Sequence, residues 1–145
     1  MAKVITIDPG KSKCGLVLAE ISEKIVYEAI ILKSEFIKDY VRNLNNVEDI
    51  SKIIIGNGTT SREILKKLDF LKNKIITFEE KNTTYRAKAR YFELFPISGF
   101  KFLIPREFFI LNKNLDAISA LIILEDYCNH KFTLSENIDI KTWLK

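Results

Sequence analysis

The N-terminal segment constrains the fold more than any other part of this sequence, because three β-forming runs follow one another there with very little chain between them. Residues 3–8 alternate apolar and polar side chains, as a strand with one buried face does, and a Pro-Gly turn follows at once. Residues 14–19 and 24–32 are also rich in apolar and β-branched residues. Connections this short join antiparallel neighbours, so we expect a three-stranded meander.

The rest of the chain predicts four helices and two further strands. The spacing of apolar residues indicates helices over residues 34–44, 60–68, 82–95 and 115–128. Residues 60–63 read as a capping box for the second helix, and Asn114 is placed to cap the last one. Two short apolar runs, residues 52–55 and 74–78, predict buried strands.

Together these elements predict an α/β fold around a five-stranded mixed sheet. Helical crossovers lead to the strands over 52–55 and 74–78, which makes both parallel to the first strand. The expected strand order is 3-2-1-4-5, with helices on both faces. The chain has 145 residues, of which 47% are hydrophobic, so we expect residues 1–145 to share one core as a single domain. Residues 130–145 show no pattern that places them.

Composition narrows the kinds of partner and metal. The formal net charge of +4 mildly favours a polyanionic partner. The most apolar stretch is too short to span a bilayer and no signal peptide is evident, so we expect a cytoplasmic protein with no membrane partner. Cys14 and Cys128 are far apart and the chain has one His, which argues against a zinc site and leaves a hard cation bound by carboxylates.

Acidic residues stand at three places where apolar surroundings would disfavour them. Asp8 ends the first strand, Glu79 and Glu80 follow the strand over 74–78, and Asp116 lies in the first turn of the most apolar helix. Each position also has an ordinary explanation. Asp is a common turn residue, a strand end is often solvated, and the helix dipole favours an acid in the first turn.

The conjunction of these acids indicates a metal site. In the expected sheet the first strand is central and the fifth lies two places away, so Asp8 and Glu80 end at the edge where α/β sheets bind ligands. A last helix laid against that edge would bring Asp116 to them. Converging carboxylates repel one another unless a cation lies between them, and oxygen ligands select Mg²⁺ or Mn²⁺. Two such ions about 4 Å apart can cleave a phosphodiester bond.

Four short motifs follow one another along the chain. They are IDPG at residues 7–10 with Ser12 and Gly15 after it, GNGTTS at 56–61, EEKNTT at 79–84 and LDAISA at 115–120. In sequence, order and spacing they resemble the motifs of the RuvC- and YqgF-type Holliday junction resolvases, which have a ribonuclease H-like fold. The resemblance covers residues 3 to about 128.

The resemblance implies a nuclease (a hydrolase) that depends on Mg²⁺ or Mn²⁺, with Asp8, Glu80 and Asp116 as its catalytic and metal-binding acids. Glu79 matches a position that is acidic in the family but is not a principal ligand. Lys113 stands where the RuvC branch carries a further acid, so the chain is closer to the YqgF branch. The substrates attributed to the family are branched DNA in recombination and, for YqgF, also precursor ribosomal RNA.

Basic residues near these acids are candidate contacts to nucleic acid. Arg86 and Arg90 lie one helical turn apart soon after Glu80, and Lys11 and Lys13 follow the turn at Asp8. A solvated helix face and a plain polar hairpin are the ordinary alternatives. We therefore expect branched DNA or structured RNA as the partner.

Two other functions stay open at this point. A nucleic-acid-binding module that has lost activity would keep the fold and the basic surface and cleave nothing. A sugar- or acetate-kinase-like ATPase also opens with an Asp-x-Gly turn, but it needs two such domains to enclose ATP. Junction resolution would require two symmetric cuts and hence a homodimer, for which the sequence gives no direct sign.

Overall fold

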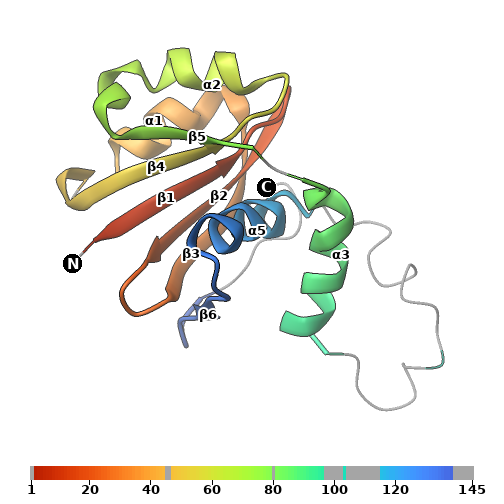
Figure 1. The fold of residues 1–145 in the computed structure, drawn as a ribbon. Coiled ribbons are helices and arrows are strands. Elements are labelled where there is room, and N and C mark those ends of the chain that lie inside the picture. Colours follow the sequence, from red (N-terminus) through yellow and green to blue (C-terminus); the bar gives the residue numbers. More distant parts are fainter. Residues whose placement is uncertain (1, 45–46, 80, 97–102, 104–114, 139–145) are drawn as a thin grey trace.

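A mixed sheet of six strands runs through the protein, with the order β5-β4-β1-β2-β3-β6 (Figure 1). The computed structural model describes residues 2–44, 47–79, 81–96, 103 and 115–138. The strands are β1 (Lys3–Asp8), β2 (Lys13–Glu20), β3 (Ile25–Lys33), β4 (Ile50–Gly56), β5 (Ile75–Phe78) and β6 (Thr133–Leu134). The protein is therefore of the α/β class, as predicted.

The strand pairing follows the lengths of the connections. The pairs β1–β2 and β2–β3 are antiparallel, which confirms the predicted meander, and β4 pairs parallel to both β1 and β5. The prediction of five strands is wrong, because β6 pairs parallel to β3. This strand has only two residues, too few for a periodic signal, and it forms because the amide of Thr133 donates to the carbonyl of Lys24, 2.9 Å away.

The helices lie close to their predicted positions, but the start of α2 is not capped as predicted. The α-helices are α1 (Ile37–Arg42), α2 (Ser61–Lys67), α3 (Thr83–Leu94) and α5 (Asp116–Cys128), and the 3₁₀ helices are η1 (Ser34–Phe36), η2 (Val47–Asp49) and η3 (Asp69–Lys74). The predicted capping box is wrong, because the side chain of Thr60 caps nothing. Instead Ser61 Oγ donates to the carbonyl oxygen of Gly58 at 2.8 Å. Asn114, the predicted cap of α5, lies outside the described residues.

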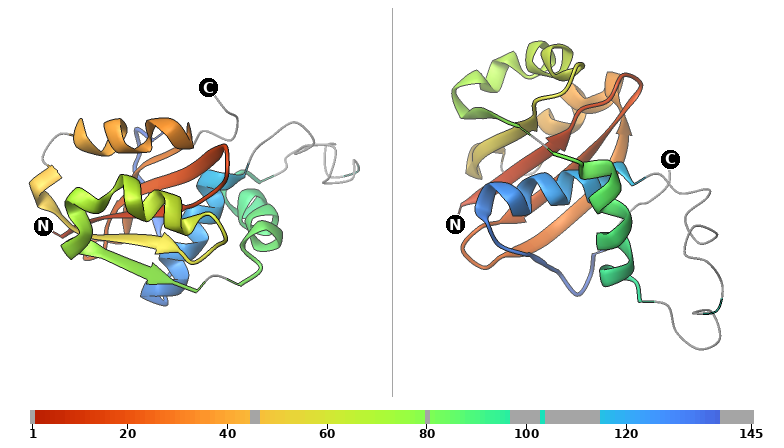
Figure 2. Two further views of the ribbon diagram at one scale, coloured as in Figure 1. Left: turned by 90° about the horizontal axis from the view of Figure 1, so that it is seen from above. Right: turned by 45° about the vertical axis from the view of Figure 1, so that its right-hand side comes forward.

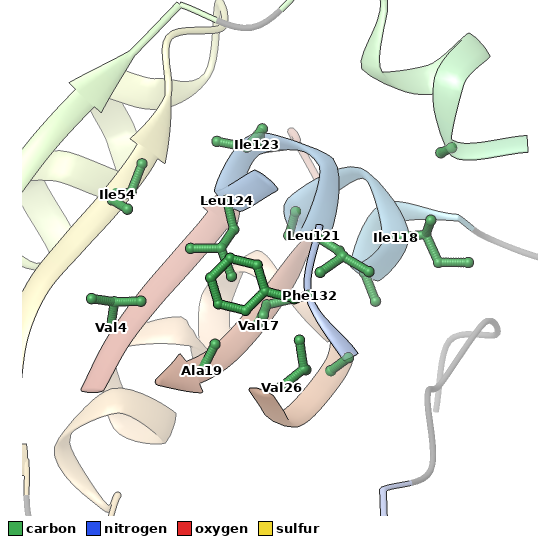
Figure 3. Packing of buried hydrophobic residues seen from close by; sticks show 14 of the residues in the cluster. Val4, Val17, Ala19, Val26, Ile54, Ile118, Leu121, Ile123, Leu124 and Phe132 are labelled. Atoms are coloured by element: carbon green, nitrogen blue, oxygen red, sulfur yellow. The ribbon is translucent and has the colours of Figure 1, made fainter. Parts of the chain in front are cut away.

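Helices cover both faces of the sheet, as predicted (Figure 2). On one face Ile5 and Ile7 of β1 pack in a cluster with buried residues of α1 and α2. On the other face Val4 packs in a second cluster with Leu121 and Leu124 of α5 (Figure 3). The two faces of β1 thus contribute to two separate cores. The prediction that residues 74–78 form a buried strand is wrong, since β5 is an edge strand with no fully buried residue.

No helix within the described ranges has both the length and the apolar character needed to cross a bilayer.

Candidate functional site

The central strand β1 ends at Asp8, beside a tight turn into β2. Asp8 stands directly opposite Gly15 in the antiparallel ladder. Within the turn, a Cβ on Gly10 would lie 2.1 Å from the carbonyl oxygen of Lys13. Only glycine lets the backbone return this closely, so the IDPG motif has a structural reason for its last residue.

The N-terminus of α5 touches the sheet at Gly15. A Cβ on Gly15 would lie 1.8 Å from the carbonyl oxygen of Asp116 and 2.7 Å from the amide nitrogen of Ala117. The first residue of α5 therefore rests on the residue directly opposite Asp8. Opposite residues of an antiparallel pair project to the same face. Asp8 thus lies on the α5 side of the sheet, next to Asp116.

The carboxylate of Asp116 is only partly satisfied. Its Oδ2 atom is buried and takes part in no hydrogen bond with the described part of the chain. The Nζ atom of Lys13 lies 3.4 Å from Oδ2, which is an ion-pair distance without hydrogen-bond geometry. The dipole of α5 also favours a charge at its first residue. A buried carboxylate oxygen nevertheless normally accepts a hydrogen bond or binds a cation.

The pKa of the Cys14 thiol is sensitive to the negative charges of Asp8 and Asp116. Cys14 is fully buried on the opposite face of β2. Burial raises its pKa to about 12, the charges of Asp8 and Asp116 contribute to the rise, and Lys67 opposes them. Both carboxylates are therefore within electrostatic reach of one thiol. At neutral pH that thiol is protonated, and it is neither a nucleophile nor a metal ligand.

The third predicted acid lies outside the described residues. The strands β1, β4 and β5 point the same way and end almost level, because Ile7 pairs with Ile55 and Gly56 pairs with Phe78 (Figure 1). Glu79 follows β5 at this edge and is exposed. Neither Glu80 nor Lys113 is described. Among the described residues no group of three or more His, Cys, Asp or Glu side chains could hold a metal.

Arg86 and Arg90 of α3 make ion pairs within the protein. Arg86 donates two hydrogen bonds to the carboxylate of Asp126, at 2.5 and 2.7 Å. Arg90 is almost buried and donates to Glu125 from Nε and Nη2, at 3.0 and 2.9 Å, and to Glu93 from Nη1. These guanidinium groups join α3 to α5 through ion pairs. The helix face that carries them is therefore not simply exposed to solvent. That either contacts phosphate stays a prediction.

Sequence reasoning misses three residues that shape this edge. The sequence marks Gly15 only as part of a motif, although its missing side chain is what admits Asp116. Nothing in the sequence singles out Lys33 and Lys67, although they surround one hollow with the predicted Lys11. No local pattern marks such residues, because their meaning depends on contacts between distant segments.

Searches of protein-family models and of curated proteins found no match to this sequence.

Proposed function

We propose that this chain is a nuclease that requires Mg²⁺ or Mn²⁺ and cleaves phosphodiester bonds of structured nucleic acid, in the manner of Holliday junction resolvases. One observation carries the proposal. The backbone of Asp116 rests on Gly15, the residue opposite Asp8, so the backbones of two acids more than 100 residues apart in sequence come close to each other at the carboxyl end of the central strand. Five of the six strands have the order β3-β2-β1-β4-β5, which supports a ribonuclease H-like fold.

The residues at this edge fit a hard cation. Asp8 and Asp116 offer carboxylate oxygens, and Oδ2 of Asp116 is buried without a hydrogen bond to any described residue. Glu80 follows β5 within two residues in the sequence and is the proposed third ligand. A bound divalent cation supplies Lewis-acid chemistry for phosphodiester hydrolysis. In the proposal, the part played by the chain is to hold these acids at one edge of the sheet.

The basic residues of the β1–β2 turn give this edge its affinity for phosphate in the proposal. Lys11 is exposed beside the turn, and Lys13 lies against Asp116. Branched DNA and structured RNA are both candidate substrates, because backbone phosphates are common to them. Residence in the cytoplasm and action as a homodimer belong to the same proposal.

A second function, an inactive nucleic-acid-binding module of the same fold, is favoured by the ion pair between Lys13 and Asp116. An ammonium group at this distance can take the place of a metal ion in neutralising the carboxylate. In that case nucleic acid would bind and stay intact.

The test is cleavage of labelled four-way DNA junctions and structured RNA with Mg²⁺ or Mn²⁺. We expect cleavage by the unaltered protein and by Asp39→Asn, an exposed acid on α1 that serves as the matched control. We expect none by Asp8→Asn. Equal cleavage by Asp8→Asn would point to a contaminant, and binding without cleavage by the unaltered protein would favour the inactive module.

A further inference from the structure

A basic hollow lies on the side of the β1–β2 turn away from α5. Its walls come from the turn, from the end of β3 with η1, and from the C-terminal end of α2, and its volume is about 380 Å³. The lining residues are Lys11, Ser12, Lys33, Ser34, Glu35 and Lys67. We call it the lysine hollow. Three lysines and one glutamate line it, so its lining carries a net positive charge.

The hollow has a firm base. Ser34 is buried, its amide donates to the carbonyl oxygen of Ser12 at 2.9 Å, and its hydroxyl donates to that of Gly10 at 2.9 Å. Lys67 donates to the carbonyl oxygen of Ser34, also at 2.9 Å. These bonds fix the turn, η1 and the end of α2 to one another. The ammonium group of Lys67 is thus held in place beside the turn.

The lysines of the hollow have no carboxylate partner in the described part of the chain, although Glu35 also lines the hollow. Within the described segments, none of Lys11, Lys33 and Lys67 forms an ion pair with a carboxylate. A structure that keeps these lysines together is suited to an anion that comes from outside.

We propose that the lysine hollow binds a backbone phosphate of the nucleic acid, one or more nucleotides away from the phosphate at Asp8. The same turn that carries Asp8 carries Lys11 and Ser12, so a strand that crosses the turn reaches both places. Charge-assisted hydrogen bonds from lysine ammonium groups are well suited to phosphate oxygens. The choice of nucleic acid as the source of the phosphate rests on the proposed function.

The experiment measures binding without metal, so it is independent of cleavage. Fluorescence anisotropy of labelled duplex and four-way DNA in EDTA is followed over a range of salt concentrations, for the unaltered protein and for Lys11→Gln/Lys33→Gln. Both lysines are exposed, so this variant should fold. The matched control, Lys66→Gln/Lys72→Gln, removes the same charge from exposed positions on α2 and η3.

We expect the hollow variant to bind at least about tenfold more weakly. Its slope of log K against log salt should fall by about one for each phosphate that it no longer neutralises. The control should change much less. Equal reductions of affinity in both variants would mean general charge attraction and would overturn the proposal, as would unchanged affinity in both. The single variant Lys67→Gln, with folding checked by circular dichroism, should also weaken binding.

Two further arms separate the sources of phosphate and the two proposals. Inorganic phosphate added at constant ionic strength should displace DNA only weakly, and saturation of the hollow by free phosphate with unchanged DNA affinity would contradict a nucleic-acid role. Asp8→Asn removes a negative charge from this edge, so without metal it should bind DNA no more weakly than the unaltered protein does. If DNA binds through the hollow but no variant ever cleaves, the proposed nuclease activity fails and the phosphate site stands.

Discussion

The acidic residues at the two ends of α5 differ in how fully their carboxylates are hydrogen-bonded. Near its C-terminus, Glu125 accepts hydrogen bonds from two nitrogens of Arg90 and from the amide of Phe132, at 2.7 to 3.0 Å. At its N-terminus, Asp116 has a buried oxygen whose ion-pair partner, Lys13, is 3.4 Å away. A buried charge that serves the fold is normally saturated. The unsaturated end is therefore the one suited to a ligand.

The groove between α3 and α5 shows the same contrast at larger scale. It is an open hollow of about 590 Å³, larger than the lysine hollow. Its charged walls are nevertheless paired, Arg86 with Asp126, Arg90 with Glu125, and Lys131 with Glu93. The hydrogen bonds from Lys131 and Arg90 hold the pKa of Glu93 below its usual value. Size alone would select this groove, whereas Asp116 near Asp8 keeps a buried carboxylate oxygen without a hydrogen bond to any described residue, as does Glu20 at the other end of β2.

The largest expected effect is a difference in cleavage rate between two Asp→Asn variants, one at each end of α5. Asp116→Asn should lower cleavage by more than about 100-fold, beyond what changes next to a metal ligand cause. Asp126→Asn makes the same chemical change on the same helix and should leave the cleavage rate within a few-fold. Single-turnover assays of both variants measure this. Similar rates for the two would remove the functional distinction between the ends.

The next effect concerns stability at the saturated end. Arg90→Met leaves Glu125 buried without its cation and should lower the free energy of unfolding by about 3–5 kcal/mol. Arg86→Met removes a more exposed pair and should cost about 1 kcal/mol or less. Urea denaturation of both variants provides the comparison. If Arg90→Met were as stable as the unaltered protein, the ion pair between Arg90 and Glu125 would not be needed to stabilise the fold.

A smaller effect is expected where α5 meets the sheet. Gly15→Ala places a Cβ within 1.8 Å of the carbonyl oxygen of Asp116. The helix must shift, and overpacking of this kind lowers the free energy of unfolding by about 1–3 kcal/mol. The displaced Asp116 should also weaken Mn²⁺ binding, measured by calorimetry. Gly58→Ala, in the loop before α2, is the control. Unchanged Mn²⁺ affinity in Gly15→Ala would contradict the placement of Asp116.

The smallest effect is a dependence on alkaline pH through Cys14. Its pKa is about 12 in the folded protein against 9.0 for the ordinary thiol. The folded state therefore keeps a proton that the unfolded state releases, so stability is full below pH 9 and falls as pH rises toward 12. The slope is up to about 1.4 kcal/mol per pH unit. Urea denaturation should show this slope in the unaltered protein and a smaller slope in Cys14→Ala.

Cys128→Ala is the control for that slope. Burial raises the pKa of Cys128 as well, but no acidic residue adds to the shift. Its removal should change the alkaline slope less than removal of Cys14. An equal change would mean that the deeper burial of Cys14 and the acids near it together have no detectable influence.

Local signals predict those parts of the fold whose causes are local. The alternation of β1 and the Pro9-Gly10 turn give its bounds to the residue. By contrast β6 depends on pairing with Ile25 and Val26, more than 100 residues earlier, and no pattern of its own marks it. The edge strand β5 reads as buried because apolar composition does not reveal which strand ends a sheet.

The candidate site divides in the same way. Chain topology predicts that Asp8 and Asp116 share one edge, because strand direction and the final helix are readable from sequence. It does not predict that Arg90 donates hydrogen bonds to Glu125, 35 residues later. Nor does it predict how closely the backbone of Asp116 approaches Gly15, because that distance depends on the packing of α5 against β2.

The most direct test of the central claim is a crystal structure of the protein soaked in Mn²⁺, with the ion located by its anomalous scattering. We predict an ion bound by carboxylate oxygens of both Asp8 and Asp116, at about 2.1 Å, and joined by Glu80. An ion bound elsewhere, or Asp8 and Asp116 turned away from each other with no ion between them, would contradict the account.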